Sequence, residues 1–324
     1  MKQALLKNLE DFRCAPGIAA QGLTIIPLFR EGNLEAGYIS LRQAFADGVL
    51  QITEVSQGGS VPNLKVTNRG KLPVLLLDGE ELRGAKQNRV LNASVLVPAA
   101  SELVIPVSCT EAGRWSYHRP DFEESGNVIA ASMKPSKMDK VSQNLKCGMV
   151  FQADQSAVWD DIEKLQMRMG ERSRTSAMAD VYASRMDNLE VFERLFHFPE
   201  LAGSQCGILV ENDGRFAGLE LVSDPAVWQD VREKIVRSYA LEVVDRPRGE
   251  PRRVETAGDE LARLLADITL EGYKSVGLGD DLRFEKQDLT GAALVWDRLL
   301  VHLAAYPRLR RQHDVNYHSP RYRS

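Results

Sequence analysis

Residues 73–92 read PVLLLDGEELRGAKQNRVLN, and this stretch leads from an apolar segment straight into a dense group of charges. The run VLLL ends at Asp78-Gly79, a dipeptide typical of a turn or of the end of a strand. If the chain stays extended after the turn, the side chains of Glu80 and Glu81 point to opposite faces. The pattern predicts a core strand, a turn and a second strand, with polar side chains where the two strands meet.

Similar short apolar segments surround this stretch from about residue 22 to residue 115. They are TIIPLF, YISLRQAF, VLQITEV, LKVTN, RVLNASVLVP and SELVIPVSC, bounded by Gly, Pro or Asn. Short strands at regular spacing are typical of an antiparallel sandwich or barrel. The segment YISLRQAFADG also fits a short helix that ends at Gly48, and the sequence leaves that alternative open.

Helical periodicity begins after this region. The segments VWDDIEKLQMRMGERS and SAMADVYASRMDNLEVFERLF carry apolar residues at steps of three and four, and Thr175 or Ser176 is a candidate cap of the second helix. A further helix is predicted from Pro225, with Asp224 as its cap. The segment DELARLLADITL also reads as a helix, and RPRGEPRRVETAGDE before it reads as a linker.

Two further segments complete the predicted fold. CGILVENDGRFAGLELVSD reads as a hairpin with an Asn-Asp-Gly turn, and YKSVGLGDDLRFEK with LTGAALVWDRLLVHLAAY reads as paired strands. We predict an α+β fold whose antiparallel, β-rich core is sandwich- or barrel-like and carries inserted helices. The predicted division is a single domain over 1–306, with a β-rich part (22–115), a helical part (136–196) and a mixed α/β part (204–306), followed by a basic tail (307–324).

Composition limits the classes of function. The chain has 324 residues and a net charge of −4, so its body does not attract polyanions in general. The tail interleaves arginines with tyrosines, a pattern that suits single-stranded nucleic acid, but the patch is short and nucleic-acid binding is not expected. The N-terminal MKQALLKNLEDFR reads as an amphipathic helix rather than a secretory signal, with Leu5, Leu6, Leu9 and Phe12 at helical spacing.

The length of the apolar runs and the spacing of the cysteines bear on cellular location and cysteine chemistry. The apolar runs are too short to span a bilayer, so we expect a cytoplasmic protein with no membrane contact. The four cysteines, Cys14, Cys109, Cys147 and Cys206, are widely spaced and form no CxxC pair. This spacing argues against a structural zinc site and a disulfide framework, and it favours free buried thiols.

The first candidate site is the stretch 78–92 itself. Asp78, Glu80 and Glu81 are the candidate catalytic carboxylates, suited to general-base chemistry. The candidate ligand-binding residues after them are Lys86, Gln87, Asn88 and Arg89, which offer cations and amides to an anion. The alternative is a solvated hairpin whose surface ion pairs each contribute about 0–1 kcal/mol.

The second candidate site is IPVSCTEAGRWSY, residues 105–117. Cys109 follows a strand whose alternation places it inward, which favours an inert thiol over a nucleophile. Arg114 and Trp115 form a better platform for a base and a phosphate, with Glu111 nearby in sequence. The alternative for Trp115 is a ring that closes the core of the sandwich.

Other motifs carry weaker signals. GLGDDLRF lacks the rest of a dinucleotide fingerprint, so a bulged hairpin strand is favoured, with Asp280 and Asp281 as a weaker cation site. None of the five histidines has an HxH or HExxH context, and we expect His302 to be a core or edge histidine with its hydrogen bonds satisfied. No metal site is predicted.

Several blocks resemble a known family. They are LLLDGEELRGAKQNRVLN, IPVSCTEAGRW, CGILVENDGRFAGLELVSDPAVW, IVRSYALE and GAALVWDRLLVHLAAY, which together cover most of the chain. The chain resembles the domain family named for its association with ADP-ribosylglycohydrolases and rhodanese-phosphatases. The resemblance implies a link to NAD-utilising and ADP-ribose metabolism, and it supplies no established catalytic residue.

Taken together, the residues and the resemblance predict binding or processing of ADP-ribose or another NAD-derived nucleotide. The expected contacts are Lys86, Arg89 and Arg114 to a diphosphate, Glu80 or Glu111 to ribose hydroxyls or Mg²⁺, Trp115 to the base, and Glu81 or Asp78 as general base. The cofactor is left open, with Mg²⁺ as the candidate. One alternative is a non-catalytic scaffold that uses the charged 78–92 hairpin as a protein interface, and another is that these residues only satisfy backbone groups between layers.

Overall fold

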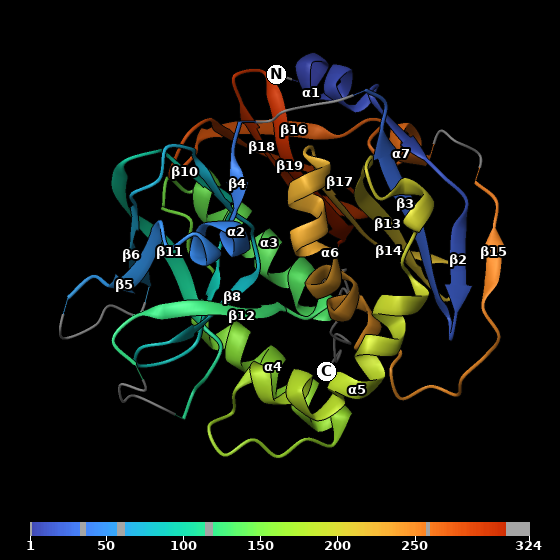
Figure 1. Ribbon diagram of the computed structural model, residues 1–324, viewed down its shortest axis with the longest axis horizontal. Coiled ribbons are helices and arrows are strands. Elements are labelled where there is room, and N and C mark those ends of the chain that lie inside the picture. The colour runs from blue at the N-terminus through green and yellow to red at the C-terminus, as the bar shows by residue number, and fades with distance from the viewer. Residues whose placement is uncertain (1, 33–36, 57–61, 114–118, 257–259, 309–324) are drawn as a thin grey trace, which may run out of the picture.

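The computed structural model describes residues 2–32, 37–56, 62–113, 119–256 and 260–308. Its strands form three sheets, and every strand pair is antiparallel except one, within the described residues. Helices lie between and around the sheets (Figure 1). The predicted α+β class with an antiparallel, β-rich core and inserted helices is confirmed.

The largest sheet has ten strands. Their bounds are β1 Phe12–Cys14, β2 Gly17–Ala20, β3 Leu23–Arg30, β13 Gln205–Asn212, β14 Arg215–Val222, β15 Arg252–Val254, β16 Thr269–Lys274, β17 Asp280–Lys286, β18 Leu289–Trp296 and β19 Leu299–Pro307. The order is β15-β2-β3-β13-β14-β19-β18-β17-β16, and β1 pairs with β3. Segments from the two ends of the sequence therefore belong to one sheet, with β13 and β14 between β3 and β19.

Two smaller sheets hold the charged stretch 73–92. One has the order β12-β8-β9-β11-β6-β5, and the other has the order β10-β7-β4 with β4 parallel to β7. The bounds are β4 Ile39–Ser40, β5 Leu50–Glu54, β6 Asn63–Asn68, β7 Val74–Leu76, β8 Glu80–Gly84, β9 Arg89–Leu91, β10 Val95–Val97, β11 Ser101–Cys109 and β12 Phe122–Val128. The stretch thus passes from the three-stranded sheet into the six-stranded sheet.

The helices of the described chain begin and end as follows: α1 Lys2–Leu9, α2 Leu41–Ala46, η1 Ala131–Met133, α3 Lys134–Lys146, α4 Gln155–Met169, α5 Met178–Leu195, η2 Pro199–Leu201, α6 Pro225–Ala240 and α7 Glu260–Leu264. None of them has both the length and the apolar character that a membrane span requires. Asp224 caps α6 as predicted, since its carboxylate accepts from the backbone N–H of Ala226 at 2.8 Å.

The ten-stranded sheet is buried on both faces. Along β3, Leu23 and Ile25 pack into one apolar core, while Ile26 and Leu28 pack into another. The first core also contains residues of α4, α5 and α6, and the second contains residues of α1 and α7. A third core fills the two smaller sheets beneath α2.

Helix α6 lies at the centre of the molecule, between the ten-stranded sheet on one side and β12 with β4 on the other (Figure 1). Few positions on it reach water, and Trp228, Lys234 and Tyr239 are almost fully buried. Lys234 and Tyr239 are polar, so this helix places polar groups in the interior, between the two sheets that it contacts.

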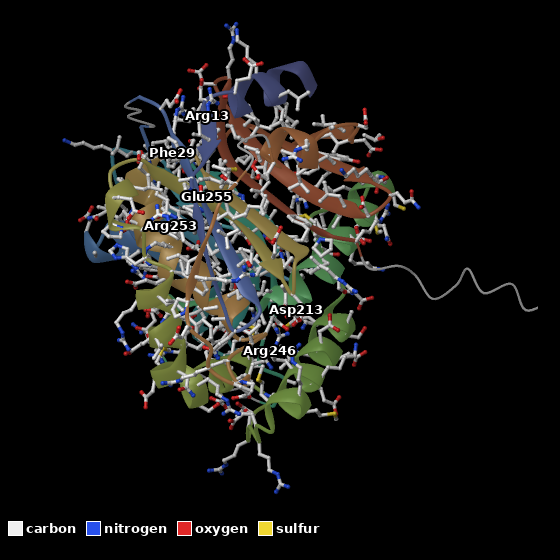
Figure 2. The ribbon with its side chains drawn as sticks, turned by 90° about the vertical axis from the view of Figure 1, so that its right-hand side faces the viewer. Arg13, Phe29, Asp213, Arg246, Arg253 and Glu255 are labelled. Carbon is white, nitrogen blue, oxygen red and sulfur yellow. The ribbon has the colours of Figure 1, made fainter. Side chains whose placement is uncertain are left out.

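The β13–β14 hairpin is tied to the chain that follows α6. Arg246 pairs with Asp213 in the turn at 3.1 Å and also donates to the carbonyl of Gln21 (Figure 2). The backbone N–H of Asp213 donates to the carbonyl of Gly22 at 2.7 Å. The turn end of this predicted hairpin is therefore fixed in position.

Three predicted elements differ from the structure. The helix expected over DELARLLADITL ends at Leu264, and β16 begins at Thr269, because residues 269–274 pair with β17. The expected linker contains β15, which pairs with β2. The N-cap of α5 is Ala177, and it is Ser173, rather than Thr175 or Ser176, whose hydroxyl accepts from the Ala177 backbone N–H.

Other expectations are resolved more simply. The open choice over YISLRQAFADG falls mainly to a helix, because Ser40 ends β4 and its hydroxyl caps α2 at the N–H of Gln43. The helix α1 ends at Leu9, before Phe12, which lies in β1. All four cysteines are free, but Cys147 is exposed and Cys14 only partly buried, so the expectation of four buried thiols is wrong there.

Candidate functional site

The Asp78-Gly79 turn packs closely against the residue that follows β12. Gly79 has φ of +85°, and a Cβ there would lie 2.9 Å from Cγ2 of Ile129. The backbone N–H of Ile129 donates to the carbonyl of Gly79 at 2.7 Å. Only glycine fits this conformation and this contact without displacement, so the turn places Asp78 and Glu80 inside the molecule.

Glu80 is paired with a lysine from α6. The Lys234 Nζ lies 2.5 Å from Glu80 Oε1 and 2.5 Å from Glu124 Oε1, and Glu80 Oε2 accepts from the N–H of Leu77. Burial raises the pKa of Glu80 in spite of the nearby ammonium. Burial also acts to raise the pKa of Glu124, but Lys234 and Arg42 outweigh it and lower that pKa. One lysine thus serves two carboxylates across the helix–sheet interface.

Glu81 points to the opposite face, as predicted, and has no ion pair among the described residues. Its carboxyl accepts from Thr110 Oγ1 at 2.8 Å and from Asn127 Nδ2 at 3.5 Å. Burial raises the pKa of Glu81, and the hydrogen bonds from Thr110 and Asn127 offset only part of that rise. The geometry fits a carboxylic acid held by neutral partners.

Asp78 lies beneath helix α3. Its carboxylate forms a buried ion pair with Lys137, which also donates to the carbonyl of Leu91 at 3.1 Å. The backbone N–H of Asp78 donates to the Ser94 hydroxyl at 2.9 Å. Burial lowers the pKa of Lys137, and the Asp78 charge opposes that effect.

A second buried carboxylate, Glu220 on β14, collects three donors. Glu220 Oε1 accepts from Lys134 Nζ at 2.6 Å, from the Tyr306 hydroxyl at 2.9 Å and from the Tyr239 hydroxyl at 3.1 Å. The ammonium of Lys134 also lies 4.7 Å from the centre of the Tyr239 ring. Burial raises the pKa of both tyrosines well above the usual value, so their hydroxyls stay protonated and donate.

His302 connects this carboxylate to Asp78. Its Nε2 lies 4.0 Å from Glu220 Oε2, and its Nδ1 lies 2.9 Å from the Ser94 hydroxyl that accepts from Asp78. Burial lowers the pKa of His302, which favours the neutral ring. The prediction of a core histidine agrees with its burial, and its Nδ1 is hydrogen-bonded, while Nε2 lies beyond hydrogen-bond distance of Glu220. We call the group Asp78, Ser94, Lys134, Lys137, Glu220, Tyr239, His302 and Tyr306 the buried polar cluster.

The other residues predicted to bind a ligand are also buried. Arg89 is fully buried, with Nη2 3.6 Å from Glu54 Oε1 and Nη1 within reach of the Gln87 carbonyl. Glu111 Oε2 accepts from the backbone N–H of Asn88 at 3.2 Å. These side chains contact one another and the backbone around β9 and the end of β11, although both carboxylate oxygens of Glu54 are buried without a hydrogen bond among the described residues.

The remaining predicted site residues are Lys86, Cys109, Arg114 and Trp115. Lys86 is half-buried. Arg114 and Trp115 lie outside the described residues, so the proposed ring-and-phosphate platform has no described geometry. Cys109 is buried, and burial raises the pKa of its thiol, an environment that suits the predicted inert thiol.

The weaker cation candidate separates into two ion pairs. Asp281 is buried and holds Arg283, with Nε 2.5 Å from Oδ1, while Asp280 pairs with Lys274 at 2.6 Å on the surface. Among the described residues, no group of three or more His, Cys, Asp or Glu side chains is placed to hold a metal ion. Both oxygens of Glu80 already accept hydrogen bonds, so a magnesium ion there would have to displace Lys234 or Leu77.

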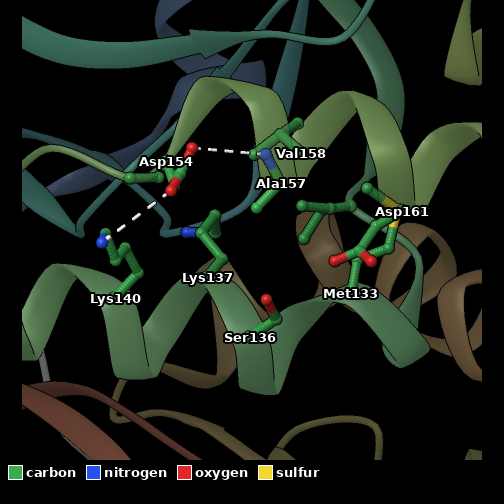
Figure 3. Close-up of a pocket in the computed structure, with 10 residues that line it drawn as sticks. Met133, Ser136, Lys137, Lys140, Asp154, Ala157, Val158 and Asp161 are labelled. Carbon is green, nitrogen blue, oxygen red and sulfur yellow. Dashed lines mark hydrogen bonds and ion pairs between the residues drawn. The ribbon is translucent and has the colours of Figure 1, made fainter.

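A small cavity reaches the outer side of the buried polar cluster. It lies between α3 and α4, with Lys137, Lys140, Asp154 and Asp161 around it (Figure 3). Its volume of about 10 Å³ is room for a single water molecule. This cavity does not accommodate a ligand, and Lys137 stays buried at its wall.

A larger cavity, which we call the β14–α6 cavity, lies on the other side of η1 and α3. Its volume is about 290 Å³. Its lining comes from β3, η1, α3, β13, β14, α6 and the end of β19, and it consists of Leu23, Ala131, Ser132, Pro135, Asn212, Arg215, Phe216, Ala217, Tyr239, Glu242 and Pro307. This volume is near the lower end of small-molecule sites, which span roughly 300–1,000 Å³.

Tyr239 belongs to both the cavity and the cluster. Its side chain lines the cavity while its hydroxyl donates to Glu220. Gly218 makes room for it, since a Cβ at that position would lie 2.0 Å from the Tyr239 hydroxyl oxygen. The cavity wall is therefore one hydrogen bond from Glu220. His302, 4.0 Å from that carboxylate, binds the Ser94 hydroxyl that accepts from the Asp78 backbone.

Several residues of these buried ion pairs come from segments that the sequence did not single out as sites. Lys134, Lys137, Glu220 and Lys234 lie on α3, β14 and α6, outside the stretch 78–92. A signal exists for Glu220, a single charge in the otherwise apolar run GLELV. Lys234 sits in an ordinary amphipathic helix, and nothing local distinguishes it from a surface lysine.

Comparison with known proteins gives one result. Residues 11–306 match the ARPP-1 family, described as the ARG and Rhodanese-Phosphatase-superfamily-associated Protein domain. No curated protein and no solved structure matches the chain. The match covers both candidate stretches, the cluster and the lining of the β14–α6 cavity except Pro307.

Proposed function

Since the chain belongs to the ARG and Rhodanese-Phosphatase-superfamily-associated Protein domain family, we propose that it binds ADP-ribose or another NAD-derived nucleotide. The family name associates these domains with ADP-ribose enzymes, which is a coarse link to this class of ligand. The observation that carries the proposal is the β14–α6 cavity, whose wall includes Tyr239 of the buried polar cluster. A ligand-sized cavity beside convergent titratable groups is the usual form of a small-molecule site.

The stretch 78–92 has an indirect part in this proposal. Its carboxylates Asp78, Glu80 and Glu81 are at most partly exposed and are held by partners on other elements. A ligand in the cavity contacts Tyr239, whose hydroxyl donates to Glu220. His302 lies 4.0 Å from that carboxylate and is hydrogen-bonded to the Ser94 hydroxyl, which accepts from the backbone N–H of Asp78. These contacts reach the backbone of Asp78, while its carboxylate pairs with Lys137.

The scaffold alternative receives less support from the geometry. A protein interface at 78–92 needs exposed charges, and of the charged side chains there Arg83 is exposed, at 60%. Glu80, Glu81 and Arg89 are buried. The surface that this hairpin offers to a partner is correspondingly small.

The test is a titration of the purified protein with ADP-ribose, NAD, AMP and ribose 5-phosphate, followed by calorimetry and thermal unfolding. A ligand at about 100 times its Kd adds about 2.7 kcal/mol to the free energy of unfolding and raises Tm by a few degrees. The variant Ser132→Trp fills the mouth of the cavity, and Ser56→Trp places the same side chain on an exposed turn after β5. We expect binding to survive in Ser56→Trp and to be lost in Ser132→Trp; no binding by the folded wild type would overturn the proposal.

A further inference from the structure

Helix α4 carries two large apolar side chains on its water-facing side. Trp159 is 37% exposed and is the one exposed tryptophan among the described residues, while Met167, at 69%, is the most exposed large apolar residue there. They are separated by two steps of four residues, so both lie on one stripe of the helix with Glu163 between them. Single exposed apolar residues are ordinary, but Trp and Met together on one stripe are typical of an interface core.

The opposite side of α4 already holds the helix in the fold. Val158, Ile162, Leu165 and Met169 belong to the first apolar core, together with residues of α5 and α6. The helix lies near the lower edge of the molecule (Figure 1). Packing within the chain therefore accounts for the buried side of α4 and does not explain why the exposed stripe is apolar at two positions.

The charges on the exposed side of α4 are separated by sign along the helix. Asp160 and Glu163 come first, Lys164 and Arg168 follow, and Arg172 comes just after the helix. This order suits the helix dipole, which favours acidic groups near the N-terminus and basic groups near the C-terminus. It also makes the face complementary to an antiparallel copy of itself, because the acidic half of each helix then meets the basic half of the other.

Most of these charges are available for contacts outside the chain. Asp160, Glu163 and Arg172 make no hydrogen bond or ion pair within the described parts of the chain. Lys164 pairs with Asp161 at 3.0 Å, but its side chain is 73% exposed, and water screens such a pair so that it exchanges easily. Arg168 differs, since it is held by Glu242 at 2.6 Å.

From this face we infer that the protein forms a homodimer in which α4 pairs antiparallel with α4 of a second copy. A two-fold axis near Glu163 and Lys164 brings Trp159 of each copy beside Met167 of the other, so a sulfur–aromatic contact forms twice. A parallel pairing would instead place like charges together. One helix face is a small interface, so the dimer is weak, with a Kd on the order of 10–100 μM, and the chain is monomeric well below that concentration.

The test is sedimentation velocity of the full chain, from about tenfold below to about tenfold above that Kd. One variant, Asp160→Lys with Glu163→Lys, makes the acidic half basic, and a second, Lys164→Glu with Arg172→Glu, does the reverse. In each variant alone like charges meet, so self-association should weaken by about 10-fold or more. An equimolar mixture of the two should form a heterodimer, because opposite charges face each other again. Lys71→Glu, an exposed charge reversal before β7, should dimerise as wild type does.

The apolar part of the face is tested by Trp159→Ser with Met167→Ser, which should be monomeric over the same range. A wild type that stays monomeric throughout overturns the inference. Dimers that persist in either charge variant or in the serine variant also overturn it, because they use another surface. Loss of association without recovery in the mixture overturns the antiparallel pairing. Circular dichroism establishes that each variant is folded.

This inference goes beyond the proposed function and is independent of it. None of the substituted residues lines the β14–α6 cavity. Titration with ADP-ribose should therefore give the same result in wild type and in each variant, whether or not the chain dimerises. Failure of the dimer leaves the proposed function standing, and failure of nucleotide binding leaves the dimer standing.

Discussion

The stretch 78–92 and the hairpin end 212–218 differ in almost every respect that matters for a site. The first is dense in charge, yet its side chains are mostly buried and paired with residues of α3, α6 and β11. The second carries few charges, yet it lines a cavity and contains polar atoms without partners. A high density of charged residues in sequence therefore indicates an internal ion network here, while the space for a ligand lies beside an ordinary hairpin.

The largest effect is expected at the centre of the ion network. Lys234→Met leaves the carboxylates of Glu80 and Glu124 without their shared cation in a buried site. Removing one partner of a buried pair costs about 3–5 kcal/mol. Urea unfolding should show this loss, while Lys164→Met, which breaks an exposed pair with Asp161, should stay within about 0.5 kcal/mol of wild type.

A loss below about 1 kcal/mol in Lys234→Met would contradict the importance of this network, because a buried unpaired charge is costly. It would mean that the carboxylates take up protons or reach water at little cost. Residues 78–92 would then no longer differ from residues 212–218 in this respect, because both regions would tolerate the removal of a polar side chain.

The next effect concerns the cavity. Gly218→Ala places a Cβ against the Tyr239 hydroxyl, which must move toward the cavity or away from Glu220. Overpacking of this kind costs about 1–3 kcal/mol, and ligand binding should weaken with it. Adding Tyr239→Phe removes the colliding oxygen and should restore part of the stability, and Gly203→Ala, which meets no atom within 4 Å, should change little.

If Gly218→Ala is neutral in both stability and binding, Tyr239 is not held where the structure places it. The wall of the cavity would then be adaptable, and the connection from the cavity to Glu220 would carry no specificity. Partial rescue by Tyr239→Phe is the result that distinguishes a local collision from a general weakening of β14.

The fold was largely predictable because local patterns determine most of it. Alternation and turn residues located β11 and the β13–β14 hairpin, and the Asp-Pro pair located the start of α6. The error after Leu264 arose because a short helix and an edge strand share one apolar run, and only the pairing with β17 decides where one ends. Such pairing is not visible in the sequence of the segment itself.

The site was less predictable because its contacts are long-range. Glu80 and Lys234 are 154 residues apart, and Ser94 and His302 are 208 residues apart. A polar loop and a buried ion network have the same composition, and burial depends on which elements cover them. The orphaned oxygen of Asn212 depends on three-dimensional packing, so the sequence shows only a turn residue there.

A smaller effect is expected in the pH dependence of stability, and it distinguishes Glu81 from the ion-paired Glu80. Burial raises the pKa of Glu81 in the fold, so over the interval between its unfolded and folded pKa values the folded state holds more protons. Its contribution to the free energy of unfolding is therefore present at low pH and is lost as pH rises through the folded pKa. Glu81→Gln does not titrate, so the fall in stability as pH rises above about 4.3, the ordinary pKa of Glu, should be smaller in this variant than in wild type.

The control for this measurement is Glu163→Gln on the exposed face of α4, which should follow wild type. A steeper pH dependence in Glu81→Gln than in wild type would mean that Glu81 is ionised and stabilised in the fold. In that case a cation other than the neutral partners Thr110 and Asn127 must balance the Glu81 charge. Glu81 would then be ion-paired, as Glu80 is.

The smallest effect is expected at the one exposed charge of the motif that forms a surface pair. Arg83 donates to Glu123 at 3.0 and 3.2 Å, but its side chain is 60% exposed. Exposed ion pairs contribute about 0–1 kcal/mol, so Arg83→Ala should lower the free energy of unfolding by less than about 1 kcal/mol. Salt near 1 M shortens the screening length to about 3 Å and should remove most of that difference. A large, salt-independent loss would show that the ion network extends to the surface of β8, and the hairpin would then have to be treated as part of the network along its whole length.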